Sequence, residues 1–440
     1  MIVFKNKIKL KIGKFLQVIG GIVMSFLIIV SAIIVFSDNK LIVVNLLRNT
    51  TNQIQETIFG DENYSVSSFG ELYKFAKGAA KGITSSDNFP QLDIKIPYEN
   101  IAVLEASKYE AKRPYVDVVL DVKSKTETLS LKGKVRYKGD RGIHIENFKK
   151  SSFRMNLKGN DRLFGLEEFS IQSPIIRNYS WELLITEIFK NEGLLTLKTE
   201  IANLSVNGDT RGLFFIEEVP STRTLERQKR KAGPIFGLDE NFGIGIDSKL
   251  DVYDIREWVD NSIYQESKKV LYKAFLEMEQ QQIIDPNIFE LDSWAKYFAL
   301  IDVFGSHHGI LPKSVRFYFN PVIGKFEPIL FDAHLGGEDL NNFILLDLLT
   351  RGVTANCDWI CPFESFHKSF LNNTDFLKLY LSYIEEYSSS QFIDNIKITY
   401  KNNYESLDNE LYSRFSLSDG ISNRALSLYL FKPEIIQKRR

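Results

Sequence analysis

The sequence has 440 residues, of which 44% are hydrophobic, and its 55 basic and 56 acidic side chains give a formal net charge of −1. This length suffices for about two to three domains, one of which could bury a large core. The nearly balanced charge excludes a global field that would attract nucleic acid, so we expect no nucleic-acid partner.

An apolar segment near the amino terminus predicts a membrane helix. Residues 15–36 carry no charged side chain and are rich in Ile, Val, Leu and Phe. Their number matches the roughly 20 residues that a helix needs to cross the bilayer core. Five lysines precede the segment, which predicts that residues 1–14 stay in the cytoplasm and that the folded part of this single-pass protein lies outside it. A cleaved signal peptide is the alternative; the length of the apolar run and the lack of a clear Ala-x-Ala site favour an uncleaved signal anchor.

The chain has only two cysteines, Cys357 and Cys361. If the predicted topology holds, both lie outside the cytosol and could form a disulfide. Their spacing suits one helical turn, which does not guarantee disulfide geometry. Two buried thiols are an equally good reading, and with only His367 nearby a four-ligand zinc site is not expected.

Residues 37–98 have a mixed composition and are interpreted as a partly helical stem. Strand patterns follow at Tyr115–Val122, Glu127–Tyr137 and Ser152–Leu157. The clearest hairpin joins Ile201–Val206 to Gly212–Val219 through Asn207-Gly208, because Asn-Gly supplies the positive φ angles of a tight turn. These segments predict a mostly antiparallel sheet with one inserted helix at 179–192.

The second half of the chain has a mainly helical pattern. Helices are predicted at Thr222–Ala232, Ser262–Gln282, Leu291–His308 and Phe366–Ser388, and a hairpin is predicted at 315–331. The fold class is therefore α+β, with a β-rich first lobe at 99–220 and a mostly helical second lobe at 221–440.

Several residues of the first lobe could handle phosphate, which requires backbone amides, a cation and carboxylates for a metal. Gly139 and Gly142 flank Asp140-Arg141 in a turn, and Lys150 precedes a strand. A chain-reversing turn and a surface lysine are the plain alternatives. Either Glu182 or Glu187, beside the apolar face of the 179–192 helix, could pair with a lysine.

Two acidic positions of the second lobe complete the candidate set. Asp302 and His308 close an apolar helix, and either could act as a general base. Asp332 follows a strand and precedes glycines, where a carboxylate could bind a metal or simply end a hairpin. Hydrolysis by a serine triad fits less well, because the chain has no G-x-S-x-G motif.

In their order along the chain, these motifs resemble the CotH kinase family, whose members are related to atypical protein kinases of the secretory pathway. The resemblance covers roughly residues 127–337. It includes the Lys-Gly-Asp-Arg turn, the Lys-Lys-Ser-Ser-Phe-Arg strand at 149–154, Arg177 before Trp181-Glu182, Glu217-Glu218 and the strand before Asp332.

The resemblance implies a bilobal, atypical protein-kinase-like fold that binds ATP with a divalent metal and phosphorylates a protein hydroxyl. Gly139, Arg141 and Gly142 would belong to the loop that covers the phosphates, and Lys150 would contact them. Glu217 and Glu218 would sit at the hinge near the adenine. Asp302 would be the catalytic base, with His308 in the same loop, and Asp332 would hold the metal.

Two departures from the family pattern bear on activity. His334 stands where a second aspartate is usual, and Lys313-Ser314 where an asparagine is usual. Mg²⁺ prefers oxygen ligands, so a His334 ligand would favour Mn²⁺ or weaken metal binding. The leading hypothesis is a membrane-anchored kinase with a protein substrate outside the cytosol. The alternative is a catalytically weak or inactive binding or scaffold protein of the envelope or surface that keeps the fold.

Overall fold

The computed structural model describes residues 89–110, 112–125, 127–139, 142–145, 151–177, 180–238, 250–311, 314–333, 345, 364–403 and 407. All of these residues belong to one compact unit of the chain. The predicted transmembrane segment, most of the predicted stem and both cysteines lie outside them. Within the described ranges, no helix is both long enough and apolar enough to span a bilayer.

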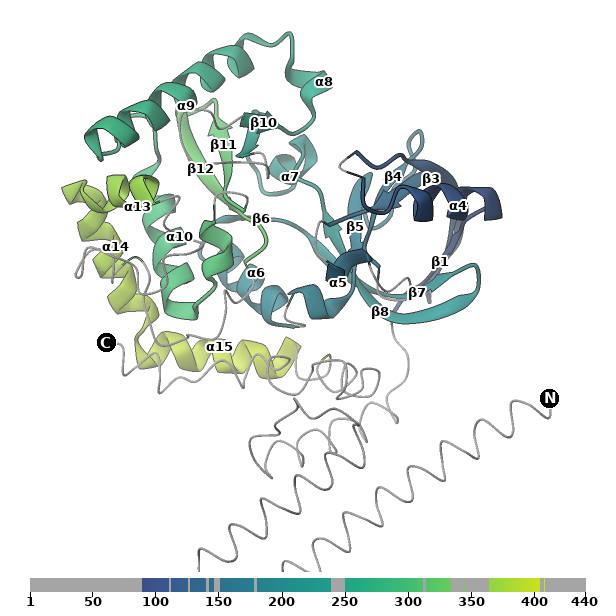
Figure 1. Cartoon of the computed structure of the whole chain (residues 1–440). Helices are drawn as coiled ribbons and strands as arrows, with labels where there is room; N and C mark the ends of the chain where they lie inside the picture. The colour runs from purple at the N-terminus through teal and green to yellow at the C-terminus, as the bar shows by residue number, and fades with distance from the viewer. Residues whose placement is uncertain are drawn as a thin grey trace, which may run out of the picture. The chain divides into compact units, whose positions relative to one another are not determined.

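Seven strands form a closed barrel (Figure 1). Neighbouring strands are antiparallel except for the pair that closes the barrel, β1 and β7, which run parallel. Their order around the barrel is β1 (Gln91–Lys95), β2 (Val116–Lys123), β3 (Thr128–Tyr137), β4 (Phe153–Leu157), β5 (Glu168–Gln172), β8 (Asp209–Glu218) and β7 (Thr199–Val206).

The barrel interior follows from the alternation of side chains along each strand. In β2, Val118 and Leu120 are buried whereas Asp117 is exposed, as the two-residue period of a strand requires. The inward residues of all seven strands, with Leu104 of the helix α4 (Tyr98–Ala106), form one hydrophobic cluster. The barrel therefore has a core of its own.

The predicted Asn-Gly hairpin is confirmed and connects β7 to β8. Asn207 and Gly208 have φ angles of 50° and 77°, the left-handed conformation that this turn needs. The Asn207 amide also accepts from the backbone N–H of Ile96 at 2.7 Å and donates to its carbonyl at 2.9 Å. The turn thus fastens the chain just after β1, next to the β1–β7 seam.

A second sheet of five strands lies outside the barrel. Its order is β10 (Leu250–Val252), β9 (Ile235–Leu238), β11 (Arg316–Asn320), β12 (Lys325–Leu330) and β6 (Leu195–Thr196). The predicted hairpin at 315–331 is confirmed as β11 and β12. The short β6 runs parallel to β12, so the segment that follows the 181–191 helix joins this sheet.

Helices surround the second sheet (Figure 1). The central one is α10 (Leu291–Phe304), in which every residue from Tyr297 to Phe304 is buried. The others are α6 (Trp181–Asn191), α7 (Thr222–Arg227), α8 (Ile255–Trp258), α9 (Ser262–Gln281), α13 (Glu364–Leu371), α14 (Thr374–Tyr387) and α15 (Ser390–Asn403), with short 3₁₀ turns η2 (Pro174–Arg177) and η3 (His307–Ile310). The one-turn helix α5 (Gly142–Ile145) lies at the barrel, where Ile145 joins the barrel cluster (Figure 1).

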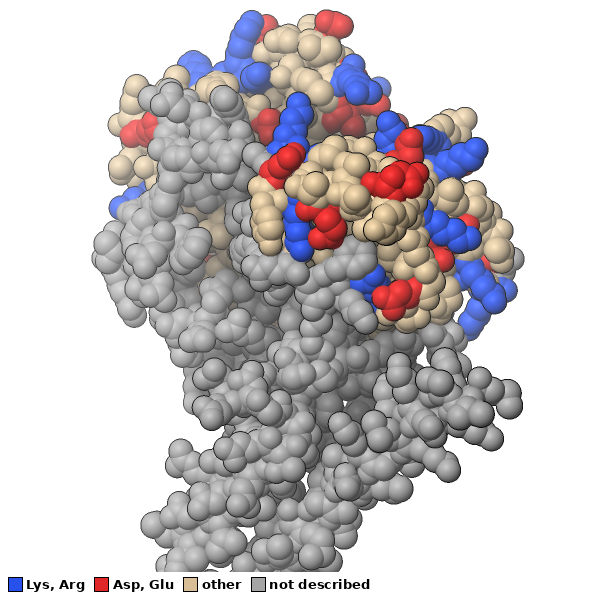
Figure 2. Space-filling model, turned by 45° about the vertical axis from the view of Figure 1, so that its right-hand side comes forward, with Lys and Arg blue, Asp and Glu red and all other residues tan. Residues whose placement is uncertain are grey.

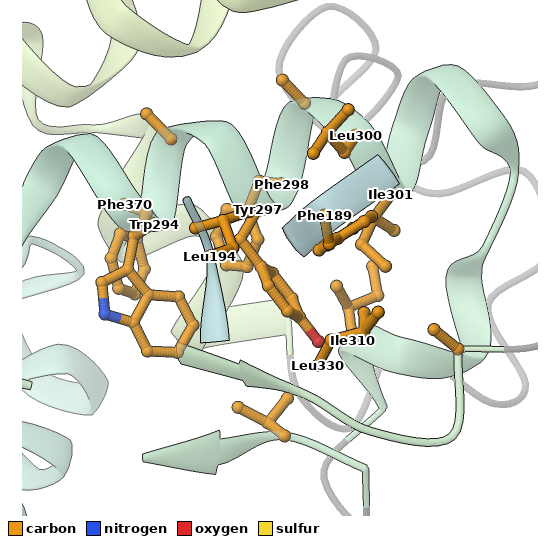
Figure 3. Close-up of a cluster of buried hydrophobic side chains, with 14 of the residues drawn as sticks. Phe189, Leu194, Trp294, Tyr297, Phe298, Leu300, Ile301, Ile310, Leu330 and Phe370 are labelled. Carbon is orange, nitrogen blue, oxygen red and sulfur yellow. The ribbon is translucent and has the colours of Figure 1, made fainter. Parts of the chain in front are cut away.

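Aromatic and aliphatic side chains pack together in the core around α10 (Figure 3). The ring of Trp294 lies 5.1 Å from that of Phe370, and the Phe298 ring lies at the same distance from Phe370. Tyr297 donates a hydrogen bond of 2.7 Å to the carbonyl of Gly309. The core therefore fixes η3, which carries His307 and His308.

The described surface mixes charges of both signs. In the face drawn in Figure 2, lysines and arginines alternate with aspartates and glutamates over the visible described residues. Surface pairs such as Lys158 with Asp117 at 2.7 Å and Arg162 with Glu167 at 2.6 Å contribute to this pattern. Such exposed pairs add little stability, typically less than about 1 kcal/mol each.

The prediction of a mixed α+β fold is confirmed, while two boundaries differ from expectation. Strand β1 belongs to the barrel although residues 37–98 were interpreted as stem. Helix α6 and strand β6 lie within the range expected for the β-rich lobe, yet Trp181 and Leu184 pack into the helical core. Both differences arise from tertiary packing, because the local sequence of each segment does not indicate which part of the fold it contacts.

Candidate functional site

The candidate site is built around Arg177, the last residue of η2 directly after β5. The whole residue is buried, with 4% exposure. The guanidinium donates to Glu217 through Nε at 2.9 Å and through Nη2 at 2.8 Å. Its Nε lies 3.2 Å from Oε2 of Glu182, and its Nη1 forms an ion pair with Oδ1 of Asp332. Three carboxylates therefore converge on one buried arginine.

The three carboxylates come from three different elements. Glu217 lies near the end of β8, paired in register with Ser170 of β5, so the barrel supplies it. Glu182 stands in the first turn of α6, and Asp332 follows β12 of the second sheet. The site therefore joins the barrel to the sheet and helices outside it.

A lysine completes the charged group. Lys138 follows β3, its side chain is 15% exposed, and its Nζ lies 3.8 Å from Oε1 of Glu217. Gln172 donates to the other oxygen of Glu217 at 2.8 Å. Two cations and three carboxylates leave one negative charge when all are ionised. We call Lys138, Arg177, Glu182, Glu217 and Asp332 the charged cluster.

Asp332 is held in an unusual backbone conformation. Its φ angle is 55°, a left-handed value that Asp tolerates better than most residues. Nδ1 of His308 donates to the Asp332 carbonyl at 2.9 Å and lies 3.2 Å from the Oδ2 atom. The adjacent Phe331 ring packs against both Arg177 and Arg316, whose guanidinium carbons lie 5.6 and 4.3 Å from its centroid. These contacts fix where the carboxylate lies.

Burial and neighbouring charges shift three pKa values within the cluster. Burial alone would raise the pKa of Glu217, but the charges of Arg177 and Lys138 outweigh it and lower that pKa to about 2. Burial raises the pKa of Glu182 to about 7, against the opposing charge of Arg177. Burial also lowers the pKa of Lys138 to about 7, although Glu217 opposes the shift. Strongly perturbed groups of this kind gather at functional sites, as well as in structural ion networks.

The structure brings together four of the residues predicted from sequence: Glu182, Glu217, His308 and Asp332. Gly139 lies in the turn after Lys138, with a φ angle of 90°, and its carbonyl accepts from Arg113 at 2.6 Å. Gly142 opens the one-turn helix α5. The other first-lobe candidates Arg141 and Lys150, and the predicted metal ligand His334, lie outside the described residues.

Three predicted residues, Glu187, Glu218 and Asp302, have partners elsewhere. Glu187 accepts from the Asn403 amide at 3.0 Å. Glu218 accepts from the backbone N–H of Lys198 at 2.8 Å and from the Thr224 hydroxyl at 2.9 Å, and it also binds Arg227. It therefore holds the start of α7 against the barrel.

Asp302 is completely buried in the helical core. The Tyr380 hydroxyl donates to its Oδ2 at 2.6 Å, and the backbone N–H of Leu345 donates at 3.2 Å. His307 Nε2 lies 3.6 Å from Oδ1. These contacts connect α10 to α14 and to residue 345.

Two members of the cluster, Arg177 and Lys138, were not among the candidates chosen from sequence. Arg177 was noted only as the residue before the Trp181-Glu182 helix, and Lys138 only as the first residue of a glycine turn. A signal did exist for Lys138, because it directly follows the predicted strand Glu127–Tyr137. No strand was predicted before Arg177. Sequence spacing cannot tell which strand ends meet.

A divalent cation such as Mg²⁺ requires several oxygen ligands directed at one point. Both carboxylate oxygens of Asp332 are engaged, one by Arg177 and the other by His308. Among the described residues, no group of three or more His, Cys, Asp or Glu side chains is arranged to hold a metal ion. In this arrangement the described residues do not fit a divalent cation, since a guanidinium lies where the carboxylates converge.

The described residues thus form a mixed α+β fold, in which a barrel meets a second sheet and its helices at a cluster of acidic and basic side chains. This cluster is a candidate site for a charged ligand. The family described as CotH kinase protein matches residues 135–425, more than half of the chain, and the chain belongs to this family. A comparison with curated proteins gave no match. Membership suggests a kinase-like function, which in general uses ATP, a divalent metal and a protein substrate.

Proposed function

We propose that this chain is a protein kinase of the CotH type, which transfers the γ-phosphoryl group of ATP to a protein hydroxyl. One observation carries the proposal: the barrel, helix α6 and the second sheet contribute Lys138, Glu217, Glu182 and Asp332 to one charged cluster. Phosphoryl transfer depends mainly on positioning and on countering the charge of the transferred group. A cluster of this composition between two sheets suits that task.

In the proposed reaction the acceptor hydroxyl oxygen forms a bond to the γ-phosphorus. The bond to the β–γ bridging oxygen breaks, and ADP leaves. The hydroxyl proton passes to a general base, for which Asp302 and His308 were the sequence candidates. His308 is the better placed, because it contacts Asp332, whereas Asp302 is fully buried among Tyr380 and the core. With Nδ1 donating to Asp332, the Nε2 atom of a neutral ring carries the basic lone pair.

Binding of the nucleotide is the first test. Saturation with ATP at about 100 times the Kd should add about 2.7 kcal/mol to the free energy of unfolding, which a thermal shift with Mg²⁺ or Mn²⁺ would detect. Incorporation of labelled phosphate into protein is the second test. Asp332→Ala should abolish it, while Glu266→Gln, at an exposed carboxylate of α9, should not. Unchanged incorporation in Asp332→Ala would remove Asp332 from the site.

The choice between Glu182 and Glu187 can be tested in the same assay. Glu182 lies 3.2 Å from the Arg177 guanidinium, whereas Glu187 lies against α15. We therefore expect Glu182→Gln to lower phosphate incorporation and Glu187→Gln to leave it near the wild-type rate. The reverse result would mean that Glu187, and not Glu182, pairs with the lysine.

The second candidate function is a binding or scaffold protein that keeps the fold without catalysis. The engaged carboxylate of Asp332 and the buried Asp302 favour it. The absence of a thermal shift with ATP and either metal, in a protein that is folded, would select this function.

The proposed location is the membrane, with residues 15–36 as the anchor and the folded part outside the cytosol. The test uses the only two cysteines of the chain, Cys357 and Cys361. After mild reduction, a membrane-impermeant maleimide should label them in intact cells. Labelling that appears only after lysis would contradict the topology.

A further inference from the structure

The position of Arg177 among three carboxylates has a consequence for metal binding. Its three guanidinium nitrogens contact Glu182, Glu217 and Asp332, and only 5% of its side chain is exposed. A divalent cation bound by the same carboxylates would need the space and the charge compensation that the guanidinium already supplies. The two cations cannot both occupy the point where the carboxylates converge.

The contacts of Asp332 add to this competition between a divalent cation and the guanidinium. One of its oxygens pairs with Arg177 and the other lies 3.2 Å from Nδ1 of His308. A metal ligated by Asp332 must therefore displace at least one of these partners. Breaking a buried ion pair is costly, because it leaves a desolvated charge without compensation.

We propose that Arg177 is a built-in cation that takes the place of a divalent metal among Glu182, Glu217 and Asp332. In this role Arg177 is a positioning residue that holds the carboxylates together and sets the metal affinity of the cluster. A divalent ion enters only by displacing the guanidinium. The inference stands apart from the proposed phosphoryl transfer, since it concerns metal binding without nucleotide.

The test measures Mn²⁺ binding to the full-length protein in the absence of nucleotide, by the loss of the free Mn²⁺ signal in electron paramagnetic resonance. Arg177→Ala should bind Mn²⁺ at least tenfold more tightly than the wild type. Adding Asp332→Asn to that variant should reverse the gain, because an amide is a weaker ligand for a hard cation. Equal affinity of the wild type and Arg177→Ala would overturn the proposal.

A matched control is Arg316→Ala. Arg316 packs against the same Phe331 ring, but its Nε donates to the Tyr253 hydroxyl at 2.6 Å. Its loss should leave the Mn²⁺ affinity within twofold of the wild type. A gain equal to that of Arg177→Ala would mean that general loosening admits the metal, and the proposal would fail.

Arg177→Ala removes the guanidinium from between three carboxylates, each at most 17% exposed, and the variant could lose its fold. The proposal then predicts that Mn²⁺ restores the fold, seen as recovered near-ultraviolet circular dichroism. Failure of Mn²⁺ to restore the fold would count against the proposal. Arg177→Lys gives a second test, because lysine keeps the charge but loses the forked contacts. Arg177→Lys should bind Mn²⁺ more tightly than the wild type. Wild-type affinity in that variant would refute the proposal.

Discussion

Replacing Lys138 with methionine should change how the stability of the protein depends on pH. Burial, together with the charges of Arg177 and Arg154, lowers the pKa of Lys138 from 10.5 to about 7, although Glu217 opposes the shift. Between pH 7 and 10.5 the unfolded chain therefore holds a proton on this lysine that the native state lacks. In that window the lysine makes stability rise with pH, by about 1.4 kcal/mol per pH unit. Methionine cannot contribute this slope.

In urea denaturation, the difference between the free energies of unfolding of the wild type and Lys138→Met should change by about 3 kcal/mol between pH 7.5 and 9.5. The wild type gains relative to the variant as the pH rises, and below pH 6 the difference should be constant because both states are protonated. Lys269→Met, at an exposed lysine of α9, is the control and should run parallel to the wild type. A constant difference between wild type and Lys138→Met across the range would refute a depressed pKa.

Three further predictions concern the stability of the fold, measured by urea denaturation. Asp302→Asn and Tyr380→Phe should each cost about 1–3 kcal/mol, and their double-mutant cycle should show a coupling of about 1 kcal/mol or more; additive effects would contradict the buried hydrogen bond. Gly139→Ala should cost clearly more than Gly208→Ala, because both have positive φ but only the first would place its Cβ against a neighbouring imidazole; equal costs would be inconsistent with this contact. Glu218→Gln should cost about 2 kcal/mol by weakening the start of α7, and a loss below 0.5 kcal/mol would contradict that role.

Local patterns were sufficient to predict most elements of the fold. The Asn207-Gly208 turn can be read from two residues, because its left-handed φ angles depend only on the turn itself. Helix α9 and helix α10 were predicted within a few residues, since their apolar side chains recur at helical spacing. Such signals lie within one element and need no knowledge of its neighbours.

Barrel closure could not be predicted in this way. Strand β1 pairs in parallel with β7 across more than 100 residues, for example Ile94 with Val206. A five-residue strand at the end of a supposed stem gives no local indication of such a distant partner. The α6 helix shows the same limit, because its apolar face is equally suited to a sheet or to other helices.

The candidate site was predicted in part for the same reason. Glu182 was predicted as a possible partner of a lysine, Asp332 as a possible metal ligand at a strand end, and Glu217 from the resemblance to the family. Arg177 was not chosen, since its role appears only when three elements bring their acidic side chains to it. Asp302 shows the opposite case, because it was predicted as a general base from its position at the end of an apolar helix. The sequence did not indicate that its carboxylate accepts a hydrogen bond from the Tyr380 hydroxyl in the core.

The seam between β1 and β7 also determines how the protein can be shortened. The family match begins at residue 135, after β1, β2 and most of β3. A fragment trimmed to that boundary would turn the barrel into an open remnant of β4, β5, β8 and β7, with bare backbone edges on both sides. Exposed edges of this kind invite pairing between molecules and aggregation. A fragment that keeps the closed barrel must therefore start upstream of Gln91, well before residue 135, where the family match begins.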